Sequence, residues 1–397
     1  MLIYWFKALY RLFILITLIV AEDKDMLIGI PKEIKNHEYR VGMTPASVKE
    51  LTKRGHHILV ETLAGAGIGF SDQDYIDAGA TIRPDAAKIF AESDMIVKVK
   101  EPQASERAML REDQILFTYL HLAPDAAQTH DLIQSKAVCI AYETVTSANR
   151  TLPLLAPMSE VAGRMSIQAA MTSLEKSHAG RGLLLGGVPG VEPAKVTIIG
   201  AGVVGRNAAQ MAAGLGAEVV IIDKNIDALR DIDAIYQGKI TTVYSTADAI
   251  EKHVLSADVV IGSVLLPGAE APKLITAEMI KRMKSGAVLV DVAIDQGGCA
   301  ETSKATTHQE PTYIVDDVVH YCVANMPGGV ARTSTVALNN ATLPYIIALA
   351  EKGYRAALLA DEHFLNGLNV YHGQLTNRFV AESHALEYVD AKVALAS

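Results

Sequence analysis

Short apolar runs alternate with segments of helical periodicity along most of the chain. The apolar runs predict a first series of strands at residues 27–31, 58–61, 94–100, 115–120 and 138–142. They predict a second series at residues 196–199, 219–222, 240–243, 259–261 and 288–290. Amphipathic segments predict helices between the strands of the first series, at residues 45–54, 72–78, 104–111 and 125–134. Strands and helices that alternate in this way are typical of an α/β fold with parallel, doubly wound sheets.

A long helix is predicted between the two series, over residues 151–177, where Pro157 lies near the start and Gly163 is the only glycine. Such a helix would form a spine between two domains. Beyond Asn325 the pattern becomes helical again, through residues 333–352. If this last segment returns to the first domain, that domain is discontinuous.

Composition and charge narrow the class of protein. The 397 residues are 50% hydrophobic and 20% charged, which is ordinary for a soluble protein of two or three domains. The net charge is −9 and lysine and arginine form no cluster, so a nucleic-acid partner is not expected. The cysteines Cys139, Cys299 and Cys322 lie far apart without metal-ligand spacing. We therefore expect reduced thiols, a cytoplasmic location and no bound metal.

Residues 1–25 differ from the rest of the chain. They contain the only tryptophan, the basic residues Lys7 and Arg11, and an apolar run over residues 12–21. This resembles the basic and hydrophobic regions of a signal peptide, but a small-x-small cleavage site is not evident. The run is also short for a membrane span. Because Met26 already begins a strand-like segment, we expect a dispensable extension from an upstream start, with a weak signal or anchor as the alternative.

The most informative stretch is residues 195–223, which read strand, glycine turn, helix, strand and acid. Gly200 permits a tight turn, Gly202 lets the backbone approach a pyrophosphate, and Gly205 lets the helix pack against the strand. The N-terminus of the helix offers N–H groups and a positive dipole end to phosphates. Asp223 follows the glycines by about 20 residues, as in dinucleotide sites, where it accepts hydrogen bonds from the ribose. Its charge would repel a 2′-phosphate, so NAD is favoured over NADP. The alternative is a close-packed turn that binds nothing.

Polar residues interrupt the apolar pattern where strands are expected to end, the position at which open parallel sheets bind ligands. Arg40 is suited to a substrate carboxylate, or is a surface arginine. Lys98 and Lys100 would face the same side if both were in a strand, and either could be a solvated edge lysine. His121 is suited to proton transfer near neutral pH, or is a satisfied core histidine. Asp295 is a candidate proton-transfer group, or a turn residue. These groups could converge on one cleft between two domains. With a nicotinamide as hydride acceptor, they would provide the proton transfer and the cations that oxidation of an amine or alcohol requires.

Several motifs together resemble those of the bacterial L-alanine dehydrogenase family. They occur in the family's order from Met26 to the C-terminus, as PKEIKNHEYRVGMTP, KVKEP, FTYLHLA, AYETV, LLAPMSEVAGR, GGVPGVEP, IGAGVVG, DVAIDQGG and VANMPGG. The resemblance implies two Rossmann-like domains, with an NAD domain at residues 154–331 inserted into a substrate domain at residues 26–153 and 332–397. It also implies a homohexamer and the reversible oxidation of L-alanine by NAD⁺ to pyruvate and ammonium.

The resemblance also implies roles for individual residues. Arg40 and Lys100 would bind the substrate, and His121 and Asp295 would be the proton donor and acceptor. The implied contacts with NAD are Ser159, Gly200, Gly202, Val203, Val204, Gly205, Asp223, Ser245, Val264, Leu265, Val292, Ala293, Ile294, Asp295, Val323, Ala324, Asn325 and Met326. One departure is Ala228, where some relatives have a basic residue near the adenosine end.

Two other functions compete with this one. The NAD-binding subunit of proton-translocating transhydrogenase shares several of the glycine motifs, but no transmembrane series follows the nucleotide segment here. A non-enzymatic NAD-binding protein would be expected to lose the polar cluster, and the cluster is complete.

Overall fold

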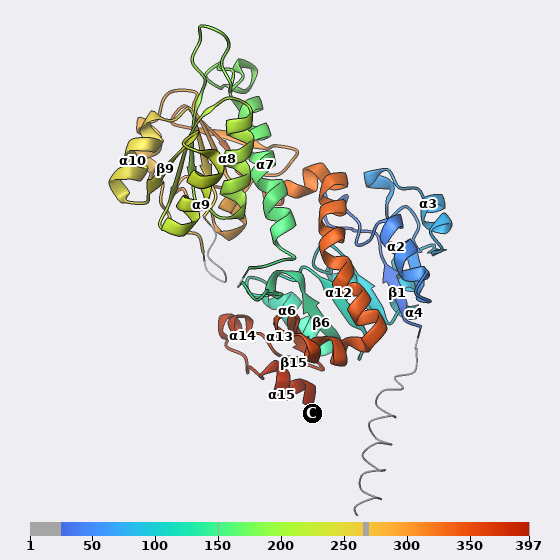
Figure 1. Cartoon of the computed structure of the whole chain (residues 1–397). Helices are drawn as coiled ribbons and strands as arrows, with labels where there is room; N and C mark the ends of the chain where they lie inside the picture. Colours follow the sequence, from blue (N-terminus) through green and yellow to red (C-terminus); the bar gives the residue numbers. More distant parts are fainter. Residues whose placement is uncertain (1–24, 150, 265–269, 397) are drawn as a thin grey trace, which may run out of the picture. The chain divides into compact units, whose positions relative to one another are not determined.

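The computed structural model describes residues 25–149, 151–264 and 270–396, and they form two compact units (Figure 1). One unit contains the described residues up to Leu155 together with those from Thr335 onward, and the other contains Ala156–Ser334. The chain therefore leaves the first unit and returns to it. Residues 1–24 and Leu265 carry predictions that lie outside the described residues.

The first unit is built on an eight-stranded sheet with the order β15-β14-β6-β5-β4-β1-β2-β3. Its strands are β1 (Leu27–Ile30), β2 (His57–Glu61), β3 (Thr81–Arg83), β4 (Met95–Val97), β5 (Ile115–Thr118), β6 (Val138–Ala141), β14 (Leu368–Tyr371) and β15 (Gln374–Leu375). The six strands from β1 to β6 are parallel, and β14 pairs antiparallel with β6. Its helices are α2 (Pro45–Thr52), α3 (Asp72–Asp77), α4 (Ala86–Glu92), α5 (Ala104–Arg107), α6 (Ala126–Ser135), α13 (Glu362–Leu365), α14 (Arg378–His384) and α15 (Ala391–Ala396), with most of α12 (Ala331–Ala360).

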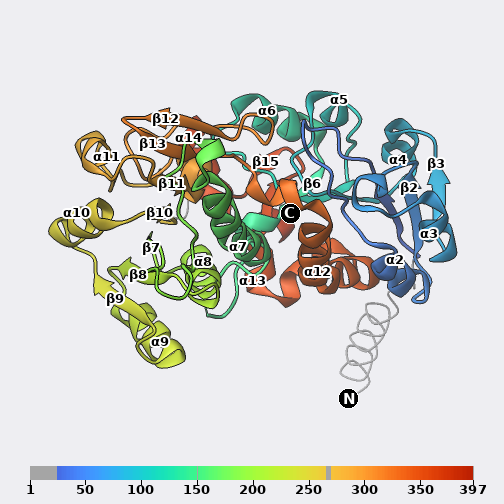
Figure 2. The same cartoon turned by 90° about the horizontal axis from the view of Figure 1, so that it is seen from above.

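The second unit is built on a seven-stranded sheet with the order β12-β13-β11-β10-β7-β8-β9, parallel except for the edge strand β12 (Figure 2). Its strands are β7 (Lys195–Ile199), β8 (Glu218–Asp223), β9 (Ile240–Tyr244), β10 (Val259–Gly262), β11 (Val288–Asp291), β12 (Thr312–Val315) and β13 (Val318–Tyr321). Its helices are α7 (Ala156–Ser173), α8 (Val203–Gly214), α9 (Ile226–Tyr236), α10 (Ala247–Ser256) and α11 (Ala277–Arg282).

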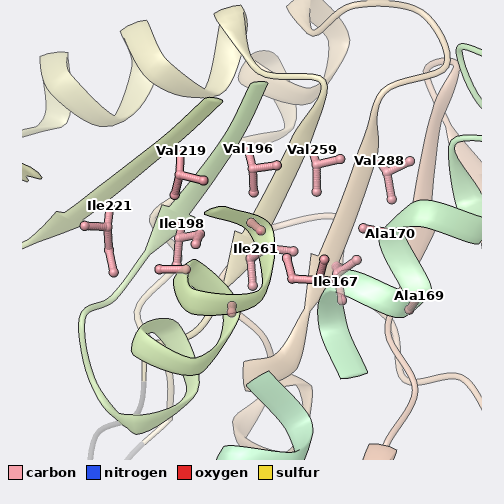
Figure 3. Packing of buried hydrophobic residues seen from close by; sticks show 14 of the residues in the cluster. Ile167, Ala169, Ala170, Val196, Ile198, Val219, Ile221, Val259, Ile261 and Val288 are labelled. Atoms are coloured by element: carbon pink, nitrogen blue, oxygen red, sulfur yellow. The ribbon is translucent and has the colours of Figure 1, made fainter. Parts of the chain in front are cut away.

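Helices cover both faces of this second sheet, because its central strands are apolar on both sides. Val196 and Ile198 are two residues apart in β7 and belong to the core on the face covered by α7, α8 and α9. Ile167 and Ala170 of α7 belong to the same core and lie near Ile261 and Val288 of the neighbouring strands (Figure 3). Ile199 belongs to the core on the opposite face, which α10 and α11 complete. A strand with two buried faces reads as a continuous apolar run, which is the pattern that predicted it. The predicted fold class, two Rossmann-like parallel sheets with an insertion, is confirmed.

Several element bounds differ from those expected. The helix predicted over residues 151–177 is shorter, since α7 begins at Ala156 and places Pro157 in its first turn, where proline costs no hydrogen bond. The helix predicted over residues 333–352 is longer, since α12 continues to Ala360 past a kink at Gly353 with φ 72°. The strand predicted over residues 94–100 ends at Val97. No helix within the described residues is long and apolar enough to cross a membrane.

Candidate active site

Three predicted substrate and catalytic residues follow neighbouring parallel strands of the first sheet. Arg40 lies beyond β1, Lys100 beyond β4 and His121 beyond β5, and these strands are adjacent in the order β5-β4-β1. Parallel strands end at the same edge of a sheet, so the chain delivers all three residues to one edge.

Arg40 is buried, with 2% of its surface exposed, so the alternative of a surface arginine is wrong. Its Nε and Nη2 donate to the two carboxylate oxygens of Glu38 at 2.7 and 2.5 Å. Burial alone would lower the pKa of Arg40, but Glu38, with smaller contributions from Tyr119 and Glu33, more than offsets this effect and the pKa is raised. The guanidinium of Arg40 is thus held in place by a bidentate pair with Glu38.

The two lysines beyond β4 have different environments. Lys98 is fully buried, and its Nζ lies 2.9 Å from Glu33 Oε2 and 2.8 Å from Glu106 Oε1. Lys100 is partly exposed. An edge position in solvent is therefore wrong for Lys98, and Lys100 is the lysine with access to a small molecule.

His121 has a left-handed backbone conformation, with φ 50°, and its side chain is 45% exposed. The alternative of a core histidine is therefore wrong. Its ring stacks on Tyr119 at 5.7 Å, and its backbone N–H donates to Glu143 Oε1 at 2.6 Å. Non-glycine residues rarely adopt this φ, so surrounding contacts must hold the turn, and Glu143 supplies one of them.

The segments that carry Lys100 and His121 run side by side. Tyr119 N donates to the carbonyl of Val99 at 3.3 Å, and Thr118 Oγ1 donates to the carbonyl of Lys100 at 3.0 Å. These bonds join the segment that follows β4 to the end of β5. The backbone positions of Lys100 and His121 therefore depend on each other.

In the second unit, the glycine turn has the geometry that a pyrophosphate site requires. Gly200 has φ 109°, and a Cβ there would meet the carbonyl of Ser263 at 2.7 Å. A Cβ at Gly205 would collide with the carbonyl of Gly200, so only glycine lets α8 start this close to β7. At Gly202 a Cβ would meet no described atom within 4 Å, which leaves open space where phosphates would approach. Gly202 also gives α8 no side-chain cap among the described residues, so its first N–H groups suit an anion.

Asp223 connects three parts of the predicted cofactor site. Its Oδ2 accepts the N–H of Ala201 in the glycine turn at 2.5 Å, and its backbone carbonyl accepts the N–H of Ser245 at 2.9 Å. Asp223 therefore lies at the end of β8 and against the glycine turn.

Helix α7 packs closely on the start of α8. A Cβ at Gly163 would collide with the carbonyl of Val204, so glycine is required at this crossing. Ser159 lies one turn before Gly163, on the same face of α7. The contact places α7 against the first turn of α8, one helical turn from Ser159.

Asp295 is exposed in the 3₁₀ turn Val292–Gln296 that follows β11. Asp291, fully buried, supports this turn from below: its carboxylate accepts the N–H groups of Ala293 and Cys299 at 3.1 and 2.8 Å. Just beyond the turn, Lys273 Nζ donates to the carbonyl of Gly298 at 2.8 Å. Asp295 is therefore a turn residue, as the alternative stated. Its role in proton transfer stays a prediction.

All the predicted cofactor residues beyond α7 that the structure describes lie at or just beyond the carboxyl ends of parallel strands in the second sheet. Asp223 ends β8, and the others follow β7 (Gly200, Gly202, Val203, Val204, Gly205), β9 (Ser245), β10 (Val264), β11 (Val292, Ala293, Ile294, Asp295) and β13 (Val323, Ala324, Asn325, Met326). Asn325 has φ 61°, and its carbonyl lies 3.1 Å from His308 Nε2. These residues therefore share one edge of the second sheet.

The sequence-based prediction did not identify the acidic residues that hold Arg40 and the turns of His121 and Asp295 in place. Glu38 binds Arg40, Glu143 binds the turn of His121, and Asp291 supports the turn of Asp295. Glu143 and Asp291 lie at the ends of strands and Glu38 lies in the loop between β1 and α2, but the partner of each acid is decided by tertiary structure. A signal was available, since Glu143 ends an apolar run and lies in the AYETV motif.

Comparison with known proteins places this geometry in one family. Residues 29–162 match the model of the alanine dehydrogenase/PNT N-terminal domain, and residues 166–378 match that of the C-terminal domain. The chain is 62% identical over 366 residues to an alanine dehydrogenase of Halomonas elongata, covering 92% of this chain and 99% of the relative. A solved L-alanine dehydrogenase superposes with a TM-score of 0.88 at 50% identity, covering 91% of this chain and 99% of that one. A transhydrogenase from Sinorhizobium meliloti has the same fold, with a TM-score of 0.76 at 24% identity, covering 89% of this chain and 99% of that one.

Proposed function

The chain belongs to the alanine dehydrogenase/PNT family, and we propose that it catalyses the reversible, NAD-dependent oxidative deamination of L-alanine. In this reaction L-alanine, water and NAD⁺ give pyruvate, ammonium, NADH and a proton. The proposal rests above all on Arg40, Lys100 and His121, which share one edge of the first sheet in a chain that also carries a dinucleotide turn.

NAD would supply the hydride acceptor, and the second unit has residues that suit it. Among the described residues, α8 starts without a side-chain cap and a Cβ at Gly202 would meet no atom within 4 Å, and both features suit a pyrophosphate. Asp223 suits a ribose without a 2′-phosphate. In this proposal the protein binds only small molecules and requires neither a metal nor a nucleic acid. The proposed homohexamer and cytoplasmic location come from the resemblance and the composition, and sedimentation of the purified protein tests the first.

The substrate groups have distinct roles. Arg40 would hold the alanine carboxylate, and Lys100 would stabilise negative charge that develops on oxygen. Loss of hydride from Cα leaves an iminium, which water attacks to give a carbinolamine, and this collapses to pyruvate and ammonium. His121 and Asp295 would move the protons that these steps require.

Absorbance at the NADH wavelength tests the proposal directly. L-Alanine with NAD⁺ should produce NADH at a higher kcat/KM than other amino acids, and pyruvate with ammonium should consume it. Absence of turnover with alanine in a folded protein that binds NADH would favour the non-enzymatic alternative.

Replacing Asp223 should change the choice of cofactor. Asp223→Ala removes the ribose acceptor and the charge that repels a 2′-phosphate, so NAD binding should weaken and the NAD/NADP ratio of kcat/KM should fall. Asp233→Ala, an exposed acid on α9, is a matched control and should leave the ratio unchanged. If the ratio does not move in Asp223→Ala, another residue selects the cofactor.

A further inference from the structure

We propose that Glu33 is a positioning residue for Lys100, holding the backbone from which the Lys100 side chain starts. The inference rests on the proposed function, in which Lys100 acts on the substrate. Glu33 follows β1 and is buried, and its carboxylate bonds to three successive residues beyond β4. Its Oε1 accepts the N–H groups of Val99 at 2.6 Å and Lys100 at 3.2 Å, and its Oε2 accepts Lys98 Nζ at 2.9 Å.

The two carboxylate oxygens of Glu33 bind different groups. Oε2 shares the buried ammonium of Lys98 with Glu106, while Oε1 bonds to the backbone of the segment that carries Lys100. Glu106 also lies beside Lys98, but its other oxygen accepts the N–H of Gln103 in its own helix cap, at 2.7 Å. Glu106 therefore shares the cation with Glu33 without sharing the amides.

The same segment is held from its other side. Thr118 Oγ1 donates to the carbonyl of Lys100 at 3.0 Å, and Tyr142 Oη donates to the carbonyl of Lys98 at 3.0 Å. With Glu33 on its N–H and Thr118 on its carbonyl, the backbone of Lys100 is fixed in two directions. A buried polar group that loses its partner also costs free energy, which strengthens the restraint.

Fixing the backbone matters because the lysine side chain itself is long and flexible. A charge that must meet developing negative charge on oxygen has to start from a defined place, and a displacement of about 1 Å can cost roughly 10²-fold in rate. Burial raises the pKa of Glu33, and the Lys98 ammonium and the Val99 amide oppose that rise. The pairing with Lys98 thus favours the deprotonated carboxylate of Glu33, which accepts the two backbone N–H groups.

The test compares Glu33→Ala with Glu106→Ala. Each variant leaves Lys98 with one carboxylate, but only Glu33→Ala releases the amides of Val99 and Lys100. Glu33→Ala should lower kcat by roughly ten-fold or more, with the NADH dissociation constant unchanged, whereas Glu106→Ala should stay within about two-fold of wild type. Glu33→Gln should recover part of the loss, because its amide oxygen can still accept the two N–H groups.

Amide hydrogen exchange of the peptide that contains residues 98–100 provides a readout that does not depend on activity. Exchange at Val99 and Lys100 should quicken in Glu33→Ala and not in Glu106→Ala. Equal losses of kcat and equal exchange in the two variants would overturn the proposal, and so would a Glu33→Ala variant with wild-type kcat. If Glu33→Ala does not fold, Glu33→Asp and Glu106→Asp, each shortened by one methylene, give the same comparison. Failure of the proposed function is distinguishable, because wild type would then lack alanine turnover while the exchange result would stand.

Discussion

Replacing His121 or Asp295 with alanine should remove most of kcat in a protein that still binds NADH. The two residues are proposed to move the protons of the reaction, and neither is part of the glycine turn that would hold the pyrophosphate. The exposed ring of His121 and the exposed carboxylate of Asp295 are both accessible to a small molecule. Steady-state kinetics in both directions and fluorescence titration of NADH measure the two effects separately. His130→Ala, an exposed histidine on α6, is a matched control and should behave as wild type.

The double variant tests whether the two residues act together. If they form one proton relay, the double variant should be little worse than the poorer single variant. Fully additive losses would assign them to separate steps, and a single variant close to wild type would remove that residue from the mechanism. Deamination by the wild-type protein should also fall at acid pH, where the base is protonated and cannot accept a proton from the substrate.

Replacing Lys100 and Arg40 should separate catalysis from substrate binding. Lys100→Ala should lower kcat by roughly 10²-fold or more, because its charge matters most as oxygen becomes negative. Arg40→Ala should act largely on the KM for alanine and pyruvate, because it removes the proposed partner of the substrate carboxylate. Both variants should bind NADH with an affinity close to that of wild type, as measured by fluorescence.

The surroundings of Lys100 and Arg40 suggest control variants for both substitutions. Lys88→Ala, an exposed lysine on α4, should keep wild-type kinetics. Arg40→Ala also leaves the Glu38 carboxylate buried without this cation, so its thermal stability should fall, and Arg40→Lys separates loss of charge from loss of geometry. A loss of NADH affinity equal to the loss of alanine affinity would contradict the assignment of both residues to the substrate.

Local rules were sufficient for much of the fold and for the cofactor turn. Gly200 and Gly205 were read from the spacing of the glycines, and the positive φ and the close approach found at these positions are short-range steric requirements. The central strands were predicted because burial on both faces gives an unbroken apolar run. The hairpin of β12 and β13 was missed, although Asp316 and Asp317 both have positive φ, the conformation of a tight hairpin turn.

Pairing between distant segments was not predictable in this way. Strand β14 lies beside β6, more than 200 residues earlier in the chain, and runs antiparallel to it. The C-terminal segment was expected to return to the first unit as helix, and it also contributes β14 and β15 to the edge of the sheet. A short apolar run does not contain the identity of its partner, so its strand order and direction depend on the packing of the whole unit.

The sequence by itself therefore determined the two parallel sheets, the glycine turn with Asp223, and the positions of Arg40, Lys100, His121 and Asp295 beyond strand ends, because these depend on periodicity and local geometry. Only the tertiary structure decided which of two lysines in one short motif is buried in an ion-pair cluster and which is accessible. Lys98 and Lys100 have the same side chain and nearly the same neighbours in sequence. They differ because Glu33 and Glu106 arrive from other segments and surround Lys98, and a buried charge is stable only where such partners meet it.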